Sequence, residues 1–136
     1  MSDTHSTYAL VQPVAGEFSQ VVELVRQALA AQGFGILTEI DVSTTLKKKL
    51  GVDHPRTLIL GACNPPLAHK ALVAAPDISV LLPCNVVVRE GEGGVEVAAI
   101  APMTMATMIS DKAVDEVATE ADRRIRAALA TLPSRG

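Results

Sequence analysis

Two cysteines, each followed directly by an asparagine, are the residues of this sequence best suited to chemistry. The first pair, Cys63 and Asn64, precedes Pro65, and the second pair is Cys84 and Asn85. Asparagine caps helices well and proline is favoured at the first helical position, so a helix is expected to begin directly after Cys63. The positive end of such a helix stabilises negative charge and would favour a thiolate at Cys63.

Three interpretations of these residues stay open. In the first, the protein binds a small polar or anionic ligand in a pocket where Asn64, Asn85 and the helix N–H groups hold it. In the second, the protein works by thiol chemistry, with Cys63 as the nucleophile and Cys84 as the resolving thiol, or as a sulfur carrier or soft-metal site. In the third, both cysteines are inert core residues of a structural module, because free cysteine is among the most buried residue types.

Donors for a metal ion are few in this chain. A structural zinc site needs four cysteine or histidine ligands, and a single pair of distant cysteines does not resemble one. Two thiolates with a thioether would suit Cu(I), and Cys63, Cys84 and either Met103 or Met105 could supply them. The alternative is that the methionines fill gaps in the core, which is their commoner use.

Acidic residues on the second predicted strand are a further candidate. Glu39 and Asp41 alternate along the strand and therefore share one face, while Ile36 and Ile40 are expected together on the other. Paired carboxylates can act as acid and base, so Glu39 is a candidate ligand-binding residue. Ser43 is expected to cap the helix that follows. The sequence has no phosphate loop, nucleophile elbow or dinucleotide motif, and no cofactor is predicted.

The composition predicts one domain in the cytoplasm. The chain has 136 residues, 49% of them apolar, which is enough to build a core without disulfides. Aromatic residues make up 2% and the net charge is −3, so we expect no nucleic-acid partner, because such a partner needs basic surfaces or aromatic platforms. No apolar run reaches the ~18 residues of a membrane span, and the polar first residues do not resemble a signal peptide.

Alternation and helical spacing divide the chain into strands and helices. The expected strands are residues 7–14, 35–42, 57–62, 84–90 and 95–101. The expected helices are residues 17–32, 44–50, 65–74 and 114–132. The order β-α-β-α-β-α-β-β-α predicts a single α+β domain over residues 7–132, with a mainly antiparallel sheet and helices packed on one face. Residues 1–6 are expected to form a flexible N-terminal tail and residues 133–136 a C-terminal tail.

The third predicted strand is apolar on both of its faces. Leu58, Leu60 and Ala62 lie on one face, and Ile59 and Gly61 lie on the other. The hairpin that follows has the same character. A sheet with apolar residues on both faces needs a second cover, and a second copy of the chain could provide it. The sequence therefore predicts a homodimer.

Three stretches resemble the domain-of-unknown-function 302 family. They are residues 33–42 (GFGILTEIDV), 60–65 (LGACNP) and 81–88 (LLPCNVVV). The motif positions that carry over are Cys63, Asn64, Pro65, Pro83, Cys84 and Asn85. The resemblance covers about residues 7–132 and implies a compact α+β domain, a dimer and no established activity. Members of the family often carry an acidic residue where this chain has Ala101, so the resemblance implies no carboxylate role there.

Overall fold

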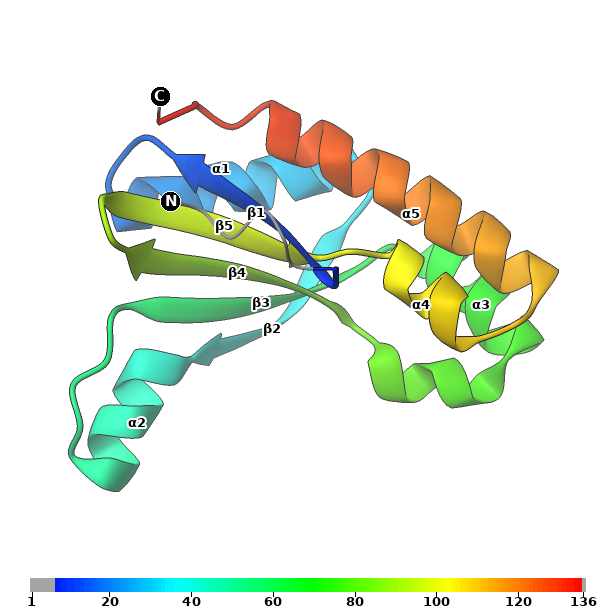
Figure 1. Cartoon of the computed structure of the whole chain (residues 1–136), viewed down its shortest axis with the longest axis horizontal. Helices are drawn as coiled ribbons and strands as arrows, with labels where there is room; N and C mark the ends of the chain where they lie inside the picture. Colours follow the sequence, from blue (N-terminus) through cyan, green and yellow to red (C-terminus); the bar gives the residue numbers. More distant parts are fainter. Residues whose placement is uncertain (1–6, 136) are drawn as a thin grey trace.

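Five antiparallel strands form one sheet in the order β1-β5-β4-β3-β2 (Figure 1). The structure is a computed structural model and describes residues 7–135, so the predicted tail over residues 1–6 lies outside the described part. The strands are β1 (Ala9–Val14), β2 (Gly35–Asp41), β3 (Thr57–Cys63), β4 (Cys84–Gly91) and β5 (Gly94–Ile100). The helices are α1 (Phe18–Ala31), α2 (Val42–Leu50), α3 (Pro65–Ala74), the 3₁₀ helix η1 (Pro76–Leu81), α4 (Met103–Met108) and α5 (Lys112–Ala130).

The predicted α+β class and the order of its elements are confirmed, with η1 and α4 as short additions. Helices α1 and α5 contact each other and form the main core with one face of the sheet (Figure 1). That core forms because apolar residues recur every second position on β3, β4 and β5 and at helical spacing on α1 and α5. Leu60, Val86 and Val97 of the sheet are fully buried there, as are Val21 and Ile125 of the helices.

A β-bulge in β2 overturns one prediction about its faces. Ile36 is opposite Ala62, on the face that carries the helices, and the register shifts by one residue between Ile36 and Thr38. Ile40 is then opposite Ile59, on the other face. The prediction that Ile36 and Ile40 share a face is therefore wrong, because the extra residue of a bulge reverses the alternation beyond it.

The cap of α2 also differs from the prediction. Asp41, not Ser43, is the N-cap residue, and its Oδ1 accepts a hydrogen bond of 3.0 Å from the backbone N–H of Thr44. The Ser43 hydroxyl donates to the same oxygen at 2.9 Å. The backbone N–H of Thr44 and then the Ser43 hydroxyl stabilise the ionised carboxylate and lower the pKa of Asp41. Aspartate caps as well as serine does, and here it stands at the position from which it reaches the third N–H.

The end of the chain packs back onto the start of the domain. The backbone carbonyl of Pro133 accepts a 3.0 Å hydrogen bond from the N–H of Ala15, and Ser134 forms an isolated β-bridge with Val14. Residues 133 and 134, expected as part of a tail, therefore extend the domain.

The second face of the sheet is apolar across its width. Val11, Ala98, Val87, Ile59 and Ile40 are directly opposite one another on successive strands, from β1 to β2. None of them belongs to the two hydrophobic clusters that the described residues form with the helices, and Ile40 is 51% exposed. Near this face, α2 projects from the β2 edge of the sheet (Figure 1). No helix in residues 7–135 is long and apolar enough to cross a membrane.

Candidate functional site: a pocket lined by sulfur

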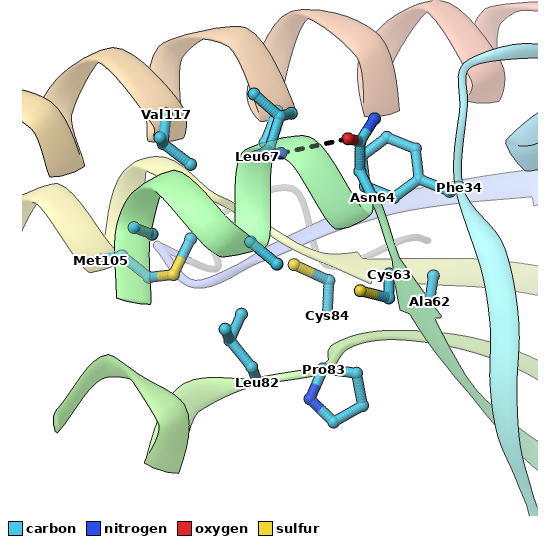
Figure 2. A pocket seen from close by; sticks show the side chains of 13 residues that line it. Phe34, Ala62, Cys63, Asn64, Leu67, Leu82, Pro83, Cys84, Met105 and Val117 are labelled. Carbon is cyan, nitrogen blue, oxygen red and sulfur yellow. Dashed lines mark hydrogen bonds between the residues drawn. The ribbon is translucent and has the colours of Figure 1, made fainter. Parts of the chain in front are cut away.

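A small pocket lies where β3 ends and β4 begins, beside α3, α4 and α5 (Figure 2). Its space is about 40 Å³, which is room for roughly three water-sized groups. Its lining is apolar apart from the end of β3 and the α3 cap, and it contains three sulfur atoms. The residues that define it are Phe34, Leu67, Val117, Cys63, Cys84 and Met105.

Strand pairing brings the two cysteines together. Strands β3 and β4 are neighbours, and Ala62 lies directly opposite Cys84, so Cys63 is one residue away from that pairing. Both are free thiols, with Cys63 half-buried and Cys84 7% exposed. In Figure 2 both sulfur atoms point the same way, towards the space bordered by Met105 and Leu82. The sequence could not fix this proximity, because it depended on the strand order.

Burial disfavours the charged form of Cys84. Removal from water, and then the neighbouring Cys63, raise the pKa of the Cys84 thiol to about 11. No ionised carboxylate, ammonium or guanidinium belongs to the lining within residues 7–135. Cys84 is therefore a neutral thiol at neutral pH, and as a free group it is a weak nucleophile.

Asn64 holds the start of α3 in place. The predicted cap is confirmed, because the Asn64 Oδ1 accepts a hydrogen bond of 3.3 Å from the backbone N–H of Leu67. The Asn64 side chain is buried, and in Figure 2 its amide points away from the two sulfur atoms. Its Nδ2 lies 3.0 Å from the point where a Cβ on Gly33 would stand, and Gly33 has a φ of +84°. The contact between α3 and the end of α1 thus needs glycine at this position.

Three other candidates lie outside the pocket. Asn85 is exposed on the face of the sheet opposite to that of Cys84, because successive side chains of a strand alternate. Glu39 forms an ion pair of 2.7 Å with Arg26 of α1. Met103 is 40% exposed, and its sulfur accepts a hydrogen bond from Thr119 on the outside of α5.

Met105, and not Met103, is the methionine that lines the pocket. It is 3% exposed and lines the pocket, because two residues along α4 turn its side chain to the opposite side of the helix. Among the described residues no group of three histidine, cysteine, aspartate or glutamate side chains could hold a metal ion. The possible soft ligands at this site are therefore Cys63, Cys84 and Met105.

Comparisons with known proteins identify the family. A family model described as "Domain of unknown function DUF302" matches residues 10–132, and the chain belongs to this family. The fold is similar to the crystal structure of an uncharacterized conserved DUF302 protein from Bacillus stearothermophilus, with a TM-score of 0.85 and 27% sequence identity. That match covers 92% of this chain and 98% of the other. None of the curated proteins with which the sequence was compared matches it.

Proposed function

We propose that this protein binds a small soft ligand, one that prefers sulfur to oxygen, in the pocket of Cys63 and Cys84. One observation supports this most strongly: two free thiols from different strands line a single pocket with apolar walls. An inert core would fill such a space with side chains, because protein interiors are close-packed. The protein would act in the cytoplasm, where its thiols stay reduced.

The geometry favours a soft ligand over the small anion that the sequence suggested. The side-chain oxygen Oδ1 of Asn64 already accepts a hydrogen bond from the backbone N–H of Leu67. That N–H is one of the donors that an anion at the start of α3 would need. Asn85 lies on the other face of the sheet. Within residues 7–135 the walls offer neither a cation nor a free set of hydrogen-bond donors, so a small hard anion would lose its water without replacement, whereas a soft ligand would bond to the sulfur atoms directly.

Reversible oxidation of the two thiols is a second candidate function. The half-buried Cys63 is more accessible than Cys84, and register places them on adjacent strands, which suits an attacking and a resolving thiol. With a peroxide as the oxidant, the Cys63 thiolate would take one oxygen to form a sulfenic acid and release water. The Cys84 thiol would then displace a second water and form the disulfide, so that two thiols and one peroxide give one disulfide and two waters.

We also propose that two copies pair through the second face of the sheet. Val11, Ala98, Val87 and Ile59 form an apolar row that lies outside both hydrophobic clusters of the described chain. On the same face Arg89 pairs with Glu96 at 3.1 Å, so the surface beside the row presents both signs of charge and two copies would not repel.

A size series of thiol reagents tests the ligand-binding proposal. The native, reduced protein is treated at pH 8 with methyl methanethiosulfonate, which is small, and with a maleimide carrying a long polyethylene glycol chain. Mass spectrometry of wild type, Cys63→Ser and Cys84→Ser assigns each addition. We expect the small reagent to modify both thiols in the native state and the large one to leave Cys84 free until the protein is denatured. If neither reagent modifies either thiol before denaturation, the cysteines are core residues and the proposal is wrong.

A further inference from the structure

We propose that the pocket holds one Cu(I) ion, bound by the sulfur atoms of Cys63, Cys84 and Met105. This inference rests on the proposed function and names its ligand class. The three residues come from the end of β3, the start of β4 and the short helix α4, which are far apart in the sequence. All three line the same cavity, and Figure 2 shows the sulfur atoms of Cys84 and Met105 turned towards the same space.

The distribution of sulfur in the chain supports this site. The sequence contains two cysteines and four methionines. Both cysteines line the pocket, together with Met105, whereas Met103 and Met108 are exposed at 40% and 63%. Packing alone explains a buried methionine, but it gives no reason for both thiols to share its cavity.

The donor set selects a soft metal ion. Thiolates and thioethers prefer Cu(I) among the biological metals, whereas zinc sites use four cysteine or histidine ligands and hard cations use oxygen. The pocket has no imidazole or carboxylate in its lining within the described residues. A space of about 40 Å³ accommodates a bare ion but is too small for the complete octahedral water shell of a hard cation such as Mg²⁺.

The walls of the pocket suit a reduced copper ion. Phe34, Leu67 and Val117 surround the sulfur atoms with hydrocarbon, and an apolar shell controls the access of solvent to a metal. Each cysteine that binds copper gives its proton to the solvent, so two thiols and one Cu⁺ give a bis-thiolate complex of charge −1 and two protons. The neutral thioether adds a third donor without adding charge.

Competition against a coloured Cu(I) chelator tests the inference. The reduced protein is titrated without oxygen into the Cu(I)–bicinchoninate complex, and loss of the complex colour measures the transfer of copper. We expect one Cu(I) per chain, no competitive binding by Cys63→Ser or Cys84→Ser, and an affinity at least about tenfold weaker for Met105→Leu. Met108→Leu is the matched control and should bind as the wild type does. Leucine has nearly the volume of methionine, so both methionine variants should fold.

The outcomes separate this inference from the proposed function. If the small thiol reagent modifies both native cysteines but the chelator keeps all the copper, the copper inference is wrong and soft-ligand binding stands. If the thiols resist every reagent and copper does not bind, both proposals are wrong. If Met105→Leu binds Cu(I) as tightly as Met108→Leu does, Met105 is not a ligand and the three-sulfur site is overturned. Circular dichroism of each variant shows that a loss of binding is not a loss of folding.

Discussion

The buried thiol of Cys84 makes the stability of this protein depend on alkaline pH. In the folded protein the pKa of this thiol is about 11, whereas its ordinary value is 9.0. Between these values the unfolded chain has lost the Cys84 proton and the folded chain keeps it. Unfolding then releases a proton, so the free energy of unfolding falls as the pH rises. This contribution is fully present below pH 9 and is lost by about pH 11.

The size of the effect follows from the difference between the two pKa values. Each unit of pKa corresponds to about 1.4 kcal/mol, so the thiol should account for a loss of about 2 to 3 kcal/mol between pH 8 and pH 11. Urea unfolding of reduced wild type and Cys84→Ala at several pH values measures it. Lysine and tyrosine side chains titrate in both proteins, and the difference between the two pH curves therefore reports Cys84 alone.

Parallel pH curves for the two proteins would show that the pKa of Cys84 is not raised in the folded state. They would mean that water solvates the Cys84 thiol in the folded protein as well as it does in the unfolded chain, whereas the structure shows this residue only 7% exposed. Cys63→Ala serves as the control for a general effect of removing a thiol. Its curve should keep most of the decline seen in the wild type, because burial is a larger cause of the raised pKa of Cys84 than the neighbouring Cys63 is.

Three further substitutions probe the elements that support the pocket and the sheet. Asn64→Ala removes the cap of α3 and should lower the free energy of unfolding by about 1 kcal/mol, as measured by urea unfolding. Gly61→Ala would place a Cβ 2.9 Å from Cγ of Pro83. This overpacking should lower the free energy of unfolding by about 1 to 3 kcal/mol, measured in the same way. If the urea midpoint of Asn64→Ala is unchanged, Asn64 does not stabilise α3 as a cap. If that of Gly61→Ala is unchanged, the packing around Gly61 is not close. Val87→Asp places a charge in the row of apolar residues on the second face and should convert a dimer into a monomer in light scattering. A monomeric wild type would remove the dimer proposal altogether.

Local signals in the sequence were sufficient for most of the fold. Short continuous apolar runs define β3 and β4. Asn64 with Pro65 fixes the start of α3, because capping depends on neighbouring residues alone. The stripe that includes Val117 and Ile125 gives α5. The bulge after Ile36 could not be predicted, because it depends on how β2 pairs with β3.

The candidate site was only partly predictable. The sequence singles out Cys63 and Cys84, but the pocket exists because β3 and β4 are neighbours and α4 folds against α5. Asn85 looked equivalent to Asn64, yet strand alternation turns it to the opposite face from Cys84. Met105 could be told from Met103 only once the packing of α4 was known. The surroundings of these side chains depend on tertiary contacts, which the spacing of residues along the chain does not predict.

A crystal structure of the reduced protein soaked with methylmercury would show whether a small soft ligand reaches the two thiols. Methylmercury is small, binds thiolates and is located without ambiguity by its strong scattering. We expect mercury on the Sγ atoms of Cys63 and Cys84 inside the pocket bordered by Met105 and Leu82. A crystal in which the protein stays folded and neither cysteine carries mercury would show that the pocket admits no soft ligand, and the proposed function would be wrong.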